Sequence, residues 1–209
     1  MSPRLADLRA IGLDVSRETS ERLEHYLDQL IRWSASINLI APIERDEAWY
    51  RHIIDSAQVF LLRDPQLRLW GDLGSGGGLP GIVNAIIARE LGPEVEFVLV
   101  ESDRRKASFL RIIARDLGLR LRCESARIED LAPLGADLIS ARALAPLDKL
   151  MGHLVRHLAP EGYALLMKGR QYENEIAAAQ QIWRFDLTLF ESRVEPDSRI
   201  LRVSNIRRA

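Results

Sequence analysis

A glycine-rich turn between an apolar run and a helical segment is the most constraining feature of this sequence. Residues 69–90 read LWGDLGSGGGLPGIVNAIIARE, with five glycines in the eight positions from Gly74 to Gly81. Glycine adopts positive φ at little steric cost and lets a ligand approach backbone N–H groups directly. Pro80 falls at the expected start of a helix, where its missing N–H has no partner to lose. The stretch therefore predicts a strand, a ligand-binding turn and a helix in succession.

Short apolar runs alternate with helical segments along the chain from this point. Strands are expected over 67–73, 95–102, 119–125, 136–141 and 162–169, and helices over 79–91, 103–118, 146–159 and 172–183. The alternation is typical of βαβ units, so it predicts an α/β, Rossmann-like fold with a mostly parallel sheet covered on both faces. The rhythm changes at residues 186–194 and 199–208, which flank a Pro-Asp-Ser turn and predict a C-terminal antiparallel hairpin.

The chain before the glycine turn has a helical pattern. Apolar side chains at helical spacing form one stripe: Leu23, Tyr26, Leu27, Leu30 and Ile31. Ser16 or Thr19 is placed to cap this helix. A second helix is expected over 47–62, because Pro65 discourages its continuation.

Length and composition limit the class of protein. The 209 residues, 47% of them hydrophobic, suffice for one domain, which we divide into an N-terminal helical lobe, residues 1–65, and an α/β core, residues 66–209. The single cysteine, Cys123, cannot form an internal disulfide or hold zinc alone, and we expect no metal. The first twenty residues contain no unbroken apolar stretch, which predicts a cytoplasmic protein with no membrane partner.

The glycine turn matches two cofactor-binding patterns. Read from Gly76, GGGLPG fits the G-x-G-x-x-G pattern of dinucleotide-binding proteins. Read from Asp72, DLGSGGG fits the D-x-G-x-G-x-G pattern of S-adenosylmethionine methyltransferases, with Gly74, Gly76 and Gly78 at the cofactor. Glu101, ending the second expected strand, suits the ribose hydroxyls of either cofactor. Asp72 would repel a pyrophosphate but can serve the ammonium group of a methionine, which favours S-adenosylmethionine.

A third cofactor-facing position is expected after the third strand, in the segment ESARIED. Glu129 is the candidate acceptor for the exocyclic amine of adenine, and Ile128 would supply an apolar wall or a backbone N–H to the ring. The alternative is that Glu129 and Asp130 form an ordinary solvated acidic pair.

The segment after the fourth expected strand lacks the residues that two kinds of base methylation require. Enzymes that methylate exocyclic amines carry D/N-P-P-Y here, whereas this chain has ARALAPL. Methylation of pyrimidine carbon 5 needs a cysteine nucleophile, and Cys123 lies near the third strand instead. A ring nitrogen such as guanine N7 has a free lone pair and needs no base, so alignment of the reactants could suffice.

Basic residues at the same ends of the strands are candidates for positioning a substrate. Arg142 could contact guanine O6 or a phosphate, or could instead form a salt bridge with Asp137. Lys168 follows the last parallel strand with Arg170 beside it, although a surface lysine that only extends its amine into water would give the same pattern. RNA contacts are also expected from other arginines: Arg51, Arg207 and Arg208.

The sequence resembles the bacterial RsmG (GidB) family of 16S ribosomal RNA methyltransferases. The resemblance rests on GSGGGLPGI at 74–82, RHIIDS at 51–56, ISARALAPL at 139–147 and MKGR at 167–170, and it extends over nearly the whole chain. It implies a class I methyltransferase fold and methyl transfer from S-adenosyl-L-methionine to N7 of one guanosine, position 527, of 16S rRNA. It also implies cofactor contacts at Gly74, Leu79, Ile128, Glu129 and Arg142.

The resemblance has departures, and two other functions remain open at this point. The family often has Trp-Asn and Asn-Leu-Thr where this chain has Trp33-Ser34 and Asn38-Leu39-Ile40, and Ile200 replaces a common histidine. These changes concern substrate docking more than the glycine turn. We expect a monomer that acts on 16S rRNA or the small ribosomal subunit. The alternatives are a nicotinamide-dependent oxidoreductase and a ribosome-associated nucleotide-binding module without activity.

Overall fold

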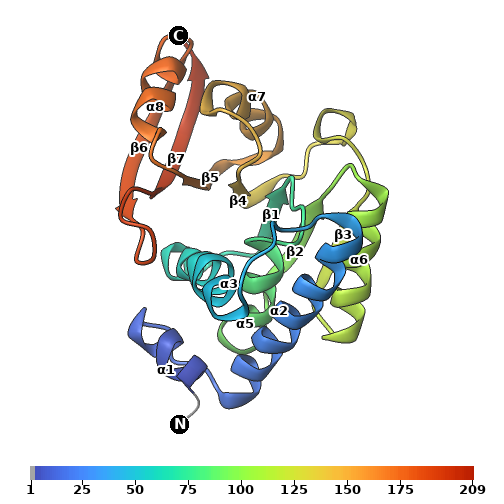
Figure 1. Ribbon diagram of the computed structural model, residues 1–209. Coiled ribbons are helices and arrows are strands. Elements are labelled where there is room, and N and C mark those ends of the chain that lie inside the picture. The colour runs from blue at the N-terminus through green and yellow to red at the C-terminus, as the bar shows by residue number, and fades with distance from the viewer. Residues whose placement is uncertain (1–2) are drawn as a thin grey trace.

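A seven-stranded sheet forms the centre of the computed structural model, which describes residues 3–209 (Figure 1). The strand order is β3-β2-β1-β4-β5-β7-β6. The strands are β1 (Leu69–Leu73), β2 (Glu96–Val100), β3 (Leu121–Glu124), β4 (Ala136–Arg142), β5 (Leu158–Lys168), β6 (Trp183–Glu191) and β7 (Arg199–Arg208). The first five strands pair in parallel, while β7 is antiparallel to both β5 and β6. The mostly parallel sheet and the C-terminal hairpin are therefore confirmed.

Helices cover both faces of the sheet, as the near-continuous apolar strands require. The helices that follow β1 are α5 (Gly81–Leu91), α6 (Arg104–Asp116), the 3₁₀ turn η3 (Ile128–Asp130), α7 (Leu147–His157) and α8 (Tyr172–Gln180). The central strands contribute residues to two separate apolar clusters, one packed under α5 and α6 and the other under α7 and α8. Trp70 and Phe97 stack in the first cluster, and Val98 and Ile139 lie in the second.

The N-terminal helices extend the first of these two layers. They are α1 (Pro3–Ala10), α2 (Arg17–Ile37), α3 (Arg45–Ala48), the π-helical turn η1 (Trp49–Ile54), α4 (Asp55–Ala57) and the 3₁₀ turn η2 (Gln58–Leu62). Ser16 caps α2 by accepting a hydrogen bond from the Thr19 amide, and four members of the predicted stripe are fully buried: Leu23, Tyr26, Leu27 and Leu30. The side chains of this lobe share one apolar cluster with α5 and the sheet. The division into lobe and core at residue 65 stays a prediction.

Several predicted boundaries differ from the structure, among them that of β5, which begins at Leu158 inside the helix expected over 146–159. The helix expected over 47–62 is interrupted by the six-residue π turn at Trp49–Ile54, a feature that often occurs at functional sites. The hairpin strand β6 begins at Trp183 rather than at Asp186, because Trp183 pairs with Arg208 and buries its ring in the second apolar cluster. The first helix, Pro3–Ala10, has no distinct signal in the sequence beyond Leu5 and Leu8, which it buries.

Candidate active site

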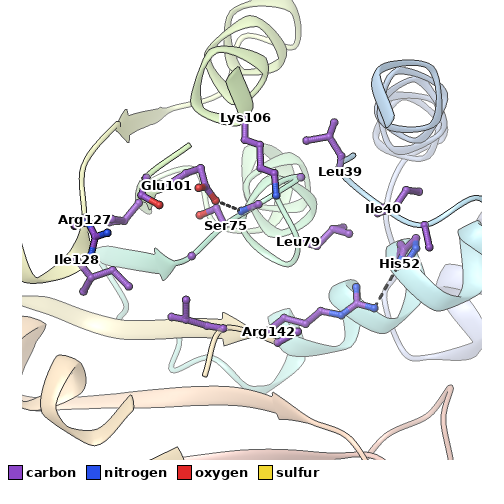
Figure 2. Close-up of a pocket in the computed structure, with 18 of the residues that line it drawn as sticks. Leu39, Ile40, His52, Ser75, Leu79, Glu101, Lys106, Arg127, Ile128 and Arg142 are labelled. Carbon is purple, nitrogen blue, oxygen red and sulfur yellow. Dashed lines mark hydrogen bonds between the residues drawn. The ribbon is translucent and has the colours of Figure 1, made fainter. Parts of the chain in front are cut away.

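A cavity of about 700 Å³ opens at the carboxyl ends of β1, β2 and β4 (Figure 2). The strand order reverses between β1 and β4, which is where open α/β sheets bind their ligands. The glycine turn forms the floor of this cavity, and the segment 39–43 from the helical lobe forms one wall. Ligand contacts in this cavity are available from both the sheet and the lobe.

The glycine turn needs glycine both for its backbone angles and for space. Gly74, Gly76 and Gly78 all have positive φ, of 66°, 57° and 97°. A Cβ added at Gly74 would lie 2.4 Å from Leu144 Cδ1, so the turn and the segment after β4 are in close contact. Gly74 and Gly76 line the cavity, whereas a Cβ at Gly78 would collide with Ile82 of α5. The first two glycines therefore expose backbone to a ligand, and Gly78 serves packing.

Glu101 joins the glycine turn to the end of β2. Its Oε2 accepts a 2.8 Å hydrogen bond from the Gly76 amide (Figure 2). Its Oε1 accepts a 2.7 Å hydrogen bond from the Asp103 amide. The side chain is 9% exposed and lines the cavity. A fixed carboxylate at this place suits a pair of ribose hydroxyls.

Asp72 lies beneath the glycine turn, and the cavity is lined by other residues. Ser140 Oγ donates a 2.5 Å hydrogen bond to Asp72 Oδ1 and accepts a 2.8 Å hydrogen bond from Trp70 Nε1. A Cβ at Gly81 would come within 2.7 Å of Asp72 Oδ2, so the carboxylate packs against the start of α5. Burial raises the pKa of Asp72 to about 6. Asp72 thus supports the turn from below, and a direct cofactor contact by this residue stays a prediction.

The short turn η3 provides the predicted third position. Ile128 is 9% exposed and lines the cavity, while Glu129 is exposed at its mouth and lies 3.3 Å from Arg127 Nη1. Hydrogen bonds from the Glu129 backbone N–H and from Arg127 lower the pKa of Glu129. Leu79 also lines the cavity, at the start of α5. The structure therefore brings these three predicted residues together with Gly74 and Glu101.

Arg142 extends from the end of β4 toward the helical lobe (Figure 2). Its Nη2 donates a 3.0 Å hydrogen bond to the Arg51 carbonyl oxygen and lies 3.2 Å from His52 Nδ1. The same nitrogen is 3.8 Å from Asp55 Oδ2. The alternative partner Asp137 is occupied elsewhere, because it accepts two backbone hydrogen bonds at the start of β1. Burial, followed by the Arg142 charge, lowers the pKa of His52 to about 4.

Lys168 lies in a second cavity, beside the first one. Its Nζ is 2.7 Å from both the Ala145 carbonyl oxygen and Glu175 Oε2, and Glu175 Oε2 also accepts a hydrogen bond from the Leu147 amide. Only 7% of the Lys168 side chain is exposed. Lys168 is therefore buried and links β5 to α8 and to the segment after β4. It is not a surface lysine that extends its amine into water. Arg170 is exposed at the same cavity.

The other predicted RNA contacts are divided between the two ends of the sheet. Arg51 lines both cavities. Strand β7 runs from Arg199, opposite Lys168, to the far end of the sheet, so Arg207 and Arg208 lie away from the cavities. The structure does not bring these two arginines to the site.

Two site features were missed from the sequence because their partners are distant in the chain. The Tyr26 hydroxyl donates a 2.6 Å hydrogen bond to the Gly77 carbonyl oxygen and so ties α2 to the glycine turn. Asp55, within the motif RHIIDS, is 8% exposed and lines the second cavity near Arg142. The sequence shows the motif, but only the fold shows which of its side chains lies at the site.

Comparisons with known proteins agree with this geometry. The family model of GidB, rRNA small subunit methyltransferase G, matches residues 19–196. A ribosomal RNA small subunit methyltransferase G from Cereibacter sphaeroides is 51% identical over 93% of this chain and 93% of its own, and one from Ruegeria pomeroyi is 45% identical over 94% and 96%. The solved structure of a SAM-dependent methyltransferase from Aquifex aeolicus has a TM-score of 0.56 at 13% identity, covering 87% of this chain and 97% of that one.

The fold and the glycine-lined cavity define a class I, S-adenosylmethionine-dependent methyltransferase. Within that class, the chain belongs to the GidB family of rRNA small subunit methyltransferase G proteins. The predicted fold class and family are confirmed, and a nicotinamide-dependent enzyme is not favoured. No helix within residues 3–209 combines the length and the apolar character that crossing a membrane requires.

Proposed function

We propose that this protein transfers a methyl group from S-adenosyl-L-methionine to N7 of a guanosine in 16S rRNA. One observation supports the proposal: the glycine-lined cavity adjoins a second cavity whose lining includes both arginines and carboxylates, and Arg142 is among the residues that line both. A cofactor in the first cavity and a nucleotide in the second would meet at Arg142. The names of the relatives supply the rRNA of the small subunit as the substrate class.

The residues of the first cavity fit S-adenosylmethionine. Gly74 and Gly76 have no side chain, so a cofactor could lie directly against their backbone. Glu101 offers a fixed carboxylate for ribose hydroxyls, and Ile128 offers an apolar wall for adenine. When bound, the cofactor supplies an electrophilic methyl group on a sulfonium sulfur. The protein's own residues orient the reactants and exclude water, which can contribute roughly 7–11 kcal/mol to lowering a barrier.

Guanine N7 suits this site because its methylation requires no proton acceptor. Burial, followed by the Arg142 charge, lowers the pKa of His52 to about 4, so the ring stays uncharged beside the guanidinium. Burial raises the pKa of Cys123 to about 11, and its Sγ faces the Ala107 carbonyl oxygen, which disfavours a thiolate that attacks a pyrimidine. A nitrogen with a free lone pair is the acceptor that these residues support best.

We further propose that the protein acts as a monomer in the cytoplasm, where its rRNA substrate is made and assembled. Arg51 and Arg170 would contact phosphates around the second cavity, so RNA binding should weaken steeply with salt. The comparisons favour an enzyme over a module that binds the cofactor without transferring its methyl group.

Methylation of rRNA from cells lacking the protein tests the proposal. Naked 16S rRNA and small subunits are incubated separately with the protein and radiolabelled cofactor, and methylated positions are mapped by strand cleavage at N7-methylguanosine. Label at one guanosine supports the proposal and shows which substrate form is used. Cofactor binding without label in either form would support the module. Thermal unfolding separates the cofactors, since a ligand at 100 times its Kd adds about 2.7 kcal/mol.

A further inference from the structure

The second cavity has a volume of about 670 Å³ and lies between β4, β5 and the hairpin loop. It shares Arg51, Arg142, Ala143 and Leu144 with the glycine-lined cavity, so the two spaces meet at the end of β4. A nucleobase that enters the second cavity would therefore approach the first cavity at Arg142.

Asp55 is a buried carboxylate that lines this second cavity. One of its oxygens accepts hydrogen bonds from the protein, and the other is open to a ligand. Gln58 Nε2 donates a 2.8 Å hydrogen bond to Oδ1, and Ser192 Oγ lies 3.4 Å from the same oxygen. Gln58 is fixed in turn because its Oε1 accepts a hydrogen bond from the Arg193 amide. Oδ2 faces Arg142 Nη2 at 3.8 Å, which is too long for a hydrogen bond. This oxygen is free to accept from a ligand.

Arg142 also has one nitrogen occupied and one free. Nη2 is bound to the Arg51 carbonyl oxygen, whereas Nη1 is buried and has no hydrogen-bond partner among residues 3–209. A buried guanidinium nitrogen without a partner is costly, and a ligand oxygen would remove that cost. The fold thus places an unused donor and an unused acceptor close together where the two cavities meet.

We infer that Asp55 and Arg142 recognise the substrate base as guanine, with the open Oδ2 of Asp55 accepting from both N1–H and N2–H and Arg142 donating to O6. This inference rests on the proposed function. The adjacent donor and acceptor repeat the pattern that cytosine offers to guanine in a base pair. Adenine would present an amino group to Arg142 and a ring lone pair to Asp55, so it is rejected.

The same arrangement turns N7 toward the cofactor. In guanine, O6 lies between N1 and N7 along the edge of the base. Asp55 lines only the second cavity, whereas Arg142 lines both cavities. With N1 at Asp55 and O6 at Arg142, the next atom along the edge is N7, on the side of the glycine-lined cavity. Recognition of the base and presentation of its reactive nitrogen thus follow from one pair of side chains.

Inosine in place of the target guanosine tests the Asp55 contact directly, because inosine lacks only the N2 amino group and keeps N7 and O6. Small subunits are assembled with a ligated 16S rRNA carrying inosine at the methylated position. For the wild-type protein, kcat/KM should fall about tenfold, the loss expected for one hydrogen bond to a carboxylate. Equal rates on inosine and guanosine would overturn the inference, and this arm needs no variant to fold.

Asp55→Asn supplies the second arm. The NH2 end of the new amide would face the guanine amino group, and two donors cannot form a hydrogen bond. We therefore expect kcat/KM on guanosine substrates to fall about 10- to 100-fold, while the Kd for S-adenosylmethionine stays within twofold. The inosine penalty should disappear in this variant. An unchanged penalty, or an unchanged rate on guanosine, would overturn the assignment.

Asp186→Asn is the matched control, since Asp186 contacts Asn205 on the hairpin away from both cavities. It should methylate guanosine and inosine substrates as the wild-type protein does. If the wild-type protein methylates no rRNA at all, the proposed function itself fails. A wild-type protein that methylates guanosine and inosine equally leaves that function standing and removes only the role of Asp55.

Discussion

The Tyr26 hydroxyl of α2 donates a 2.6 Å hydrogen bond to the carbonyl oxygen of Gly77 in the cofactor turn. Leu30, one helical turn further along α2, packs on the same glycine, since a Cβ there would lie 2.8 Å from Leu30 Cδ1. The helical lobe therefore supports the glycine turn through α2. Burial raises the pKa of Tyr26 well above its usual range. The phenol stays protonated and remains a donor.

Tyr26→Phe should weaken both the fold and the cofactor site. The substitution leaves the buried Gly77 carbonyl without its partner, so we expect the free energy of unfolding to fall by about 1–2 kcal/mol. The Kd for S-adenosylmethionine should rise about threefold, because the turn loses one of its supports. Urea denaturation and calorimetry measure the two effects. Tyr50→Phe removes an exposed hydroxyl contact with Asp7 and should change neither quantity appreciably.

The parts of this site that could be predicted from the sequence are those set by local pattern. Glycine spacing and strand–helix alternation gave the turn, the sheet and Glu101 at the end of β2, because each depends on neighbours in the chain. The Tyr26–Gly77 and Asp55–Arg142 contacts join residues 51 and 87 positions apart, by the difference of their numbers. No local periodicity encodes such pairs, since tertiary packing alone decides which polar side chains meet.

Lys168 illustrates the same limit at a charged residue. Its position at the end of a strand predicted a positive group at this edge of the sheet, and in the structure Lys168 lines the second cavity. The sequence did not predict that Glu175, in the first turn of α8, would reach back to bind it. Paired in this way, the ammonium group has less capacity to bind a phosphate.

Lys168→Ala should therefore act mainly on stability and on the segment after β4. It leaves Glu175 and the Ala145 carbonyl without their partner. Because Glu175 is partly exposed, we expect a loss of about 2 kcal/mol in the free energy of unfolding, less than for a fully buried pair. Cofactor affinity should fall with it, since Leu144 of the same segment packs on Gly74.

Arg170→Ala is the comparison for Lys168→Ala. Arg170 is exposed at the second cavity, so its loss should weaken RNA binding. The slope of log K against log salt concentration should become shallower by the contribution of about one phosphate contact. Stability and cofactor affinity should stay unchanged. Filter binding at several salt concentrations measures this effect. Loss of RNA affinity alone in Lys168→Ala would contradict the structural role given to Lys168.

Gly74→Ala should disable cofactor binding more than it disturbs the fold. The new Cβ would require a left-handed backbone at φ +66° and would lie 2.4 Å from Leu144 Cδ1, so the cavity wall must shift. We expect the Kd for S-adenosylmethionine to rise about tenfold or more, as measured by calorimetry. Gly152→Ala is the matched control: it lies within α7 with open space around it and should raise stability by about 0.5–1 kcal/mol. Equal cofactor affinity in the two variants would argue against the turn as the cofactor cradle.

Asp72 should make the stability of the protein depend on pH. Burial raises its pKa from 3.8 to about 6, so the folded protein holds this proton more tightly than the unfolded chain does. The stability that this proton contributes is present in full below pH 3.8 and is lost as the pH rises through about 6. The total change is at most roughly 3 kcal/mol, from the size of the pKa shift.

Asp72→Asn removes this titration and keeps an oxygen that can accept the Ser140 hydrogen bond. The stability of the wild-type protein relative to Asp72→Asn should therefore decrease between pH 4 and pH 8, as measured by urea denaturation at each pH. Asp14→Asn, an exposed carboxylate paired with Arg9 on the surface, should show no comparable trend. A relative stability that rises with pH would mean that hydrogen bonds to the Asp72 carboxylate outweigh the cost of burying its charge.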